Sequence, residues 1–221
     1  MVSSGMEATF GFVDLAGFAA LTEEHGDHAA ADLVEHFTQI VGELLPGDGR
    51  LVKTIGDAVL VTIPTPAVAL DFVERLWTRA TAEAGFPTLR AGLHHGEAVE
   101  RAGDVFGAAI NLAARVTSHA AGGEVLATQG VAEAARAQHR HVRALGPVAL
   151  KNLSLPVELF AIACGAGVER KAIDPVCRMR VDPESAVGHL RIDEADFWFC
   201  SLDCIARFSA HPSRFILART T

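Results

Sequence analysis

The 221-residue sequence predicts an α+β fold: a β-α-β-β-α-β unit followed by a small cysteine-containing α/β module. Two observations predict the first part. Short apolar runs alternate with longer stretches of helical periodicity, and Pro or Gly clusters separate them. A third observation predicts the module. Near residue 165 the chain becomes Gly-rich and then charged, and three of the four cysteines follow that change.

The first strand is expected at Ala8–Val13, an apolar, partly β-branched run that ends at Asp14. Residues from about Ala19 to Leu45 carry apolar side chains at helical spacing, which predicts a long helix. The Pro46–Gly49 segment, Pro-Gly-Asp-Gly, is typical of a helix stop.

Two strands follow, at Leu51–Ile55 and Ala58–Ile63, and only Gly56 and Asp57 separate them. A Gly-Asp pair between apolar runs indicates a hairpin with Asp57 at its turn. The other expected elements are helices at Pro66–Ala84, Ala109–His119 and Val131–Arg136, strands at Leu89–Val99, Glu124–Ala127, Val142–Leu145 and Pro156–Ile162, and a polar loop at Arg101–Asp104. This order is that of a ferredoxin-like core.

Composition narrows the functional classes. The formal net charge is −8, so the chain has no broad basic surface for DNA or RNA. No apolar run is long enough to span a membrane, and the N-terminus lacks the features of a signal peptide. We therefore expect a cytoplasmic protein without a membrane or nucleic-acid partner, whose cysteines have a metal or thiol role.

Asp14, at the end of the first strand, and Asp57, in the hairpin turn, are candidate metal ligands. In a ferredoxin-like sheet the first strand is central and can neighbour the hairpin, so the two carboxylates could converge. Such a pair raises a pKa or recruits a hard cation such as Mg²⁺ or Mn²⁺. The alternative is structural, with Asp14 as a helix cap and Asp57 as an ordinary turn residue.

Three further polar residues interrupt apolar segments. Lys53 lies in an otherwise apolar strand, where it either projects into a cleft or guards a sheet edge. Asn111 and Arg115 are four residues apart on a predicted helix and share one face. Arginine suits phosphate and asparagine can orient a sugar, although a solvated polar stripe would have the same spacing.

The segments FVDLAGFAAL, VKTIGDAVLV and DVFGAAINLAAR, in this order, resemble the catalytic domain of class III adenylate cyclases. The resemblance extends from about Ala8 to Ala163. It implies that Asp14 and Asp57 bind two Mg²⁺ or Mn²⁺ ions per site, and that the backbone carbonyl of Leu15 is a further ligand.

The same resemblance implies roles for five more residues. Lys53 and Asp104 match the pair that recognises adenine, while Asn111 and Arg115 match the residues that position the ribose and stabilise the pentacovalent phosphorus. Lys151 resembles the lysine that holds the triphosphate.

Three positions depart from the family pattern. Asn152 stands where a glycine usually follows the triphosphate lysine, which makes the match at Lys151 looser. Ala19 replaces a frequent threonine, and Ala108 replaces a frequent acidic or polar residue. Neither Ala19 nor Ala108 is a catalytic position of the family, so we expect these two departures to tune activity rather than remove it.

The implied reaction converts ATP to 3′,5′-cyclic AMP and pyrophosphate at a site formed across a head-to-tail homodimer, so a monomer would be inactive. A guanylate cyclase would carry a glutamate-like residue at Lys53 and a small polar residue at Asp104, and the sequence opposes this. The alternative of another class is a catalytically silent sensor or dimerisation module. Loss of Asp14, Asp57 or Arg115 would have marked it, and all three are present.

The C-terminal segments DPVCRMRV, FWFCSLDC, ARF and HPSRF resemble a YHS domain over about residues 174–215. We therefore expect a cyclase domain at residues 1–164, a linker at 165–172 and a YHS-like domain at 173–221.

The thiols of Cys177, Cys200 and Cys204 could converge on Zn²⁺ or Cu⁺ as a second metal site. His189, His211 or an aspartate could provide a fourth ligand, and the sequence selects none of them. The alternative is a compact core with buried cysteines. The sequence does not indicate what signal such a module would sense.

Overall fold

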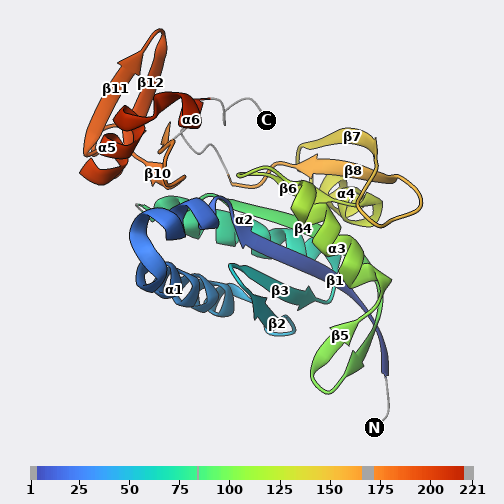
Figure 1. The fold of residues 1–221 in the computed structure, drawn as a ribbon. Helices are drawn as coiled ribbons and strands as arrows, with labels where there is room; N and C mark the ends of the chain where they lie inside the picture. The colour runs from blue at the N-terminus through green and yellow to red at the C-terminus, as the bar shows by residue number, and fades with distance from the viewer. Residues whose placement is uncertain (1–3, 84, 166–171, 217–221) are drawn as a thin grey trace.

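The computed structural model describes residues 4–83, 85–165 and 172–216 (Figure 1). Its main part combines one large sheet with four helices within these residues. The strands are β1 (Ser4–Leu15), β2 (Arg50–Ile55), β3 (Ala58–Ile63), β4 (Leu89–Arg101), β5 (Asp104–Phe106), β6 (Val125–Ala127), β7 (Val142–Val148) and β8 (Val157–Ile162). The helices are α1 (Phe18–Leu44), α2 (Pro66–Ala82), α3 (Ala108–His119) and α4 (Gln129–Ala137).

The strand order in the sheet is β2-β3-β1-β4-β6-β8-β7, and β5 pairs with the end of β4. β1 is central and runs antiparallel to both neighbours, β3 and β4. The segment β2-β3-β1-β4 has the arrangement of a ferredoxin-like core, which confirms the predicted fold class. The register places Asp14 opposite Ala58 on β3 and opposite Arg90 on β4, so the end of β1 lies beside the β2–β3 turn.

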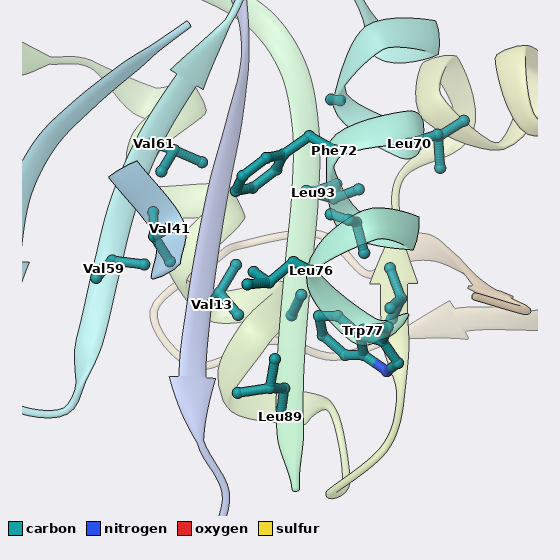
Figure 2. Close-up of a cluster of buried hydrophobic side chains, with 14 of the residues drawn as sticks. Val13, Val41, Val59, Val61, Leu70, Phe72, Leu76, Trp77, Leu89 and Leu93 are labelled. Carbon is teal, nitrogen blue, oxygen red and sulfur yellow. The ribbon is translucent and has the colours of Figure 1, made fainter. Parts of the chain in front are cut away.

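Each face of the sheet packs against different helices. Val13 and Leu15 of β1 face a core that α1, α2 and α4 cover, and Figure 2 shows Phe72 and Leu76 of α2 pointing into it. Phe10 and Phe12 face the opposite way, toward α3. This alternation follows from the two-residue period of a strand. Asp14, two residues after Phe12, is therefore on the same face of the sheet as Phe12.

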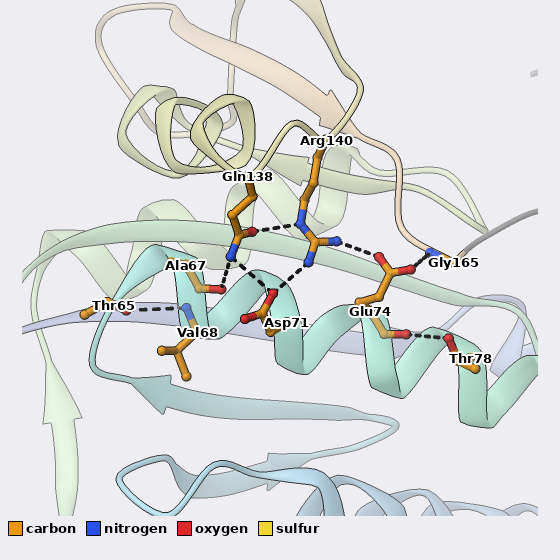
Figure 3. A network of polar contacts seen from close by, with 9 residues as sticks. All are labelled: Thr65, Ala67, Val68, Asp71, Glu74, Thr78, Gln138, Arg140 and Gly165. Atoms are coloured by element: carbon orange, nitrogen blue, oxygen red, sulfur yellow. Dashed lines mark hydrogen bonds and ion pairs between the residues drawn. The ribbon is translucent and has the colours of Figure 1, made fainter.

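A polar network fixes the end of β8 to α2 (Figure 3). The Arg140 guanidinium lies 2.8 Å from an oxygen of Asp71 and 2.6 Å from an oxygen of Glu74. The backbone N–H of Gly165 donates to the other oxygen of Glu74 at 3.0 Å. The chain is therefore anchored at the point where it leaves the large sheet.

The C-terminal module has its own small core, built around Phe197, Phe199 and Phe208. Its elements are β9 (Ala172–Ile173), β10 (Arg180–Val181), β11 (Gly188–Ile192), β12 (Ala195–Phe199), α5 (Leu202–Ala210) and α6 (Pro212–Ile216). This matches the expected small α/β module. Most of the predicted linker, residues 166–171, lies outside the described residues, and Ala172 already begins β9.

β1 extends beyond the predicted Ala8–Val13 at both ends, and one predicted loop was wrong. Arg101–Asp104 is not a polar loop but a hairpin turn, because Arg101 ends β4 and Asp104 begins β5. Ala102 and Gly103 form the turn with φ of 53° and 79°, the positive values of a two-residue hairpin. Among the helices in the described part of the chain, none is long and apolar enough to cross a membrane.

Candidate active site

Asp14 and Asp57 converge at one end of the large sheet, as their spacing predicted. Asp14 is buried, and one of its carboxylate oxygens, Oδ1, is buried without a hydrogen-bond partner among the described residues. The pKa of Asp57 is raised to about 6, first by burial and then by the neighbouring Asp14 carboxylate. A buried, unpaired carboxylate oxygen beside a second carboxylate is a donor set suited to a hard divalent cation.

Sequence reasoning missed Arg90, which faces Asp14 across the β1–β4 ladder. Its Nε and Nη2 atoms lie 2.9 and 2.5 Å from Asp14 Oδ2. The signal was an arginine at the start of the largely apolar stretch Leu89–Leu93. The charge of Arg90 offsets part of the repulsion between the two aspartates and leaves Asp14 Oδ1 free to bind.

Lys53 and Asp104 meet although 51 residues separate them. Lys53 Nζ lies 2.8 and 2.6 Å from the two oxygens of Asp104. These hydrogen bonds hold the pKa of Asp104 below its usual range, helped by the backbone N–H of Val105. Both side chains are about one third exposed, so the pair is accessible to a ligand. The β4–β5 hairpin, unexpected from the sequence, places Asp104 there.

Asn111 and Arg115 share a face of α3, as expected. Asn111 is exposed and Arg115 is half-buried. Within the described residues, neither side chain has a recorded hydrogen bond or ion pair. The two polar groups are therefore available to a partner from outside this chain.

Lys151 is exposed in a turn between β7 and β8. Asn152 has φ of 65°, a left-handed conformation in which asparagine is the most tolerated residue after glycine. Asn152 thus occupies a backbone conformation that glycine also adopts readily. The contacts within this chain do not bring Lys151 to the two aspartates.

The three cysteines of the module converge as predicted. Cys200 Sγ lies 3.3 Å from Cys177 Sγ and 3.8 Å from Cys204 Sγ. Cys200 lies just before α5 and Cys204 lies in its first turn. The two thiols, expected to be neighbours on one helix, therefore meet at the start of α5. Hydrogen bonds from Cys177 and then Cys204 lower the pKa of Cys200 to about 4, and the pKa of Cys177 is raised by its partners.

His189 and His211 are not at this cluster. His189 stacks on Trp198 with ring centroids 4.0 Å apart and bonds to Asp196 at 2.7 Å. His211 caps the end of α5. The residue that joins the three cysteines is His25 of α1, which sequence reasoning did not consider.

Comparison with known proteins gives one family for the large domain. Residues 3–163 match the adenylate and guanylate cyclase catalytic domain. A pH-sensitive adenylate cyclase of Mycobacterium tuberculosis is 37% identical over 164 residues, which are 72% of this chain and 41% of that protein. An adenylate cyclase of Glutamicibacter nicotianae is 31% identical over 158 residues, which are 71% of this chain and 39% of that protein. This chain thus matches about two fifths of the length of these relatives.

Solved structures show the same fold. The adenylyl cyclase CyaB from P. aeruginosa superposes with a TM-score of 0.65 at 20% identity, covering 76% of this chain and all of that one. A structure of adenylate cyclases from Trypanosoma brucei in their monomeric state gives a TM-score of 0.66 at 22% identity, with 80% of this chain and 93% of that one covered. The matched family region ends at residue 163, so the YHS resemblance of the module stays a prediction.

Proposed function

This chain belongs to the family of adenylate and guanylate cyclase catalytic domains, and from that premise we propose that it converts ATP to 3′,5′-cyclic AMP. In this reaction the ribose 3′-oxygen forms a bond to the α-phosphorus. The bond from the α-phosphorus to the bridging oxygen of the β-phosphate breaks, and pyrophosphate leaves. The proton of the 3′-hydroxyl passes to solvent, so no covalent enzyme intermediate is needed.

The observation that carries the proposal is the convergence of Asp14 and Asp57. Two carboxylates with one buried, unpaired oxygen between β1 and the β2–β3 turn fit Mg²⁺ or Mn²⁺, and the Leu15 carbonyl lies next in the chain. Two such ions, when bound, lower the pKa of the 3′-hydroxyl and collect charge at the α-phosphate. Arg90 pairs with Asp14 and would add positive charge near the phosphates of a bound nucleotide.

The Lys53–Asp104 pair supports adenine as the base. A lysine donates to an acceptor nitrogen of adenine, and a carboxylate accepts from the exocyclic amino group. Guanine presents a carbonyl oxygen where adenine has this amino group, so the Asp104 carboxylate would face another acceptor. The paired charges therefore favour ATP over GTP.

The site is proposed to form between two chains. Asn111 and Arg115 would serve the metal pair of the partner chain, with Arg115 stabilising charge at the phosphorus in the transition state. Their lack of recorded side-chain partners among the described residues supports this arrangement. So do the exposed apolar side chains of Ile55 and Phe106, which lie on the hairpins that carry Asp57 and Asp104.

The test is direct. The purified chain is incubated with ATP and Mn²⁺, and cyclic AMP is measured beside an Asp57→Ala variant. Asp48→Ala is the matched control, because Asp48 is an exposed turn aspartate in the Pro46–Gly49 segment. We expect product from the wild type and from the control only. No product at protein concentrations that force dimerisation would favour the catalytically silent alternative.

A further inference from the structure

Four potential ligand atoms meet where the C-terminal module contacts α1. They come from His25 and from the three cysteines Cys177, Cys200 and Cys204, and all lie within 4.8 Å of one another. We propose that they form a tetrahedral Zn²⁺-type site whose fourth ligand, His25, comes from the cyclase domain, so that the metal clamps the module to α1. The sequence predicted only the three thiols.

The spacing of the sulfurs fits one metal ion. Two thiolates bound to a tetrahedral zinc at about 2.3 Å lie about 3.8 Å apart. The distance from Cys200 Sγ to Cys204 Sγ is 3.8 Å, and the distance to Cys177 Sγ is 3.3 Å. Three thiolates and one imidazole are a common ligand set of structural zinc, and the cysteines that still carry a thiol proton lose it to solvent on binding.

A buried carboxylate organises the thiols before any metal binds. Asp174 is fully buried. One of its oxygens accepts from the backbone N–H groups of Val176 and Cys177 at 2.8 and 3.4 Å, and the other accepts from Cys200 N–H at 2.8 Å. Ser201 caps α5 by accepting from Cys204 N–H at 3.1 Å. These bonds fix the backbone of each cysteine, as supporting bonds do in metal sites.

The His25 segment is also held on the module by charge. Arg207 of α5 donates to Glu24, whose side chain is only 2% exposed, and to Glu23 at 2.9 Å. Gly17 lies against Arg178, and a Cβ at Gly17 would be 2.5 Å from the Arg178 Cβ. The first turns of α1 and the glycine before them therefore lie against the Cys177 loop and against α5, which carries Cys204.

A second set of contacts continues the interface toward α2 and β4. The Arg180 guanidinium donates to the Thr81 carbonyl at 2.6 Å and to its hydroxyl at 3.1 Å. Met179 forms a β-bridge with Pro87. Because protein contacts already orient the two domains, a metal need only complete the interface, which keeps the entropy cost of adding His25 small.

The clamp would act on a distinct part of α1. Gly26 interrupts the helix with φ of 83° and ψ of 167°, so the preceding turns from Phe18 to His25 form a separate unit. This unit begins four residues after Asp14. A metal bound to His25 thus ties the segment next to the proposed cyclase site to the module.

Metal binding tests the proposal without any cyclase assay. The reduced full-length chain is loaded with Co²⁺ and then titrated with Zn²⁺. We expect one ion per chain at this site, with the visible bands of tetrahedral cobalt and a thiolate charge-transfer band, both displaced by zinc. His25→Ala should weaken Zn²⁺ binding at least about tenfold and change the visible bands. His28→Ala, an exposed α1 histidine, should change neither.

Two further variants make the assignment sharper. Cys200→Ser should lose the charge-transfer intensity of one thiolate, and His25→Cys should keep zinc and add one thiolate. Identical affinity and spectra in His25→Ala and wild type would overturn the role of His25. Failure of the wild type to bind either ion, or its purification with a Cys177–Cys200 disulfide and no metal, would overturn the site.

Hydrogen exchange tests the clamp itself. Zinc should slow exchange of the backbone amides of residues 18–25 in wild type, and should not do so in His25→Ala. Zinc binding that leaves these amides unchanged in wild type would overturn the clamp. Both readouts are independent of the proposed cyclase activity, so failure of one proposal is distinguishable from failure of the other.

Discussion

The two candidate metal sites take their ligands from the fold in different ways. Asp14 lies near the end of β1 and Asp57 in the β2–β3 turn beside it, so the register of β1 on β3 brings them together. The cysteine cluster instead needs two domains to meet, because His25 and Cys177 are 152 positions apart in the chain. The first offers hard oxygen ligands and, in the proposed arrangement, would need a second chain for a complete site. The second offers mainly soft ligands, and all four of its proposed ligands come from one chain.

This difference teaches what each site depends on. The aspartate pair is formed by the topology of one sheet, and the proposed cyclase site around it would depend on dimer assembly. The cysteine site is built by domain docking and is complete once the module is in place. Substitutions should therefore affect chemistry at the first site and domain coupling at the second.

Asp14→Asn should produce the largest effect. The substitution keeps the shape of the side chain but removes the charge that pairs with Arg90 and that we propose binds metal. We expect cyclic AMP formation to fall at least about a hundredfold, the scale of losing one essential electrostatic contact. Zinc affinity at the cysteine cluster should not change, and a parallel loss there would contradict the independence of the two sites.

Lys53→Glu should be the next largest. It places a second carboxylate against Asp104, where the structure has two hydrogen bonds to an ammonium. Loss of a charged hydrogen bond corresponds to about tenfold to a hundredfold in turnover of ATP. The Lys53→Glu, Asp104→Ser double variant should relieve the repulsion and gain activity on GTP. Unchanged ATP turnover in the single variant would disprove the role of the pair.

The sequence anticipated most of the large sheet because its strands and helices carry strong local signals. β3 has the predicted bounds Ala58–Ile63, and the hairpin turn at Asp57 was expected from the Gly-Asp pair. β5 was missed because the hairpin turn before it contains Ala102 at a positive φ, and alanine is not a residue that predicts this conformation.

The missed site residues have a different cause. Arg90 meets Asp14 across 76 positions, and His25 meets the cysteines through domain docking. Their roles depend on tertiary register, which a single sequence does not reveal. The family resemblance predicted candidate site residues in the large domain. It could not predict a ligand shared between two domains.

The pH dependence of Mn²⁺ binding should give a smaller effect, which is specific to the aspartate site. The pKa of Asp57 is raised to about 6, so below that pH a proton competes with the cation for this carboxylate. Mn²⁺ affinity should change little between pH 8 and pH 7 and fall about fivefold on going from pH 6 to pH 5. Calorimetric titration of the Cys200→Ser variant, which lacks the thiol site, measures this. An affinity unchanged between pH 7 and pH 5 would contradict it.

Two glycines in α1 should give the smallest effects, with opposite signs. Gly26→Ala forces a left-handed backbone on alanine and should destabilise the chain by about 1–2 kcal/mol. Gly42→Ala, in the exposed helical part, should stabilise it by about 0.5–1 kcal/mol. Denaturant unfolding measures both. A stabilising Gly26→Ala would show that the kink after the His25 segment is not maintained in solution.

The central claim is that one chain supplies the metal aspartates and its partner supplies Arg115. Mixing Asp57→Ala with Arg115→Ala, each inactive alone, tests it most directly. After subunit exchange, half of the dimers contain one chain of each kind, and each mixed dimer has one intact site of two. We predict recovery of about a quarter of wild-type cyclic AMP formation. No recovery, despite exchange verified by a tagged subunit, would place Arg115 and Asp57 in the same chain's site and contradict the account.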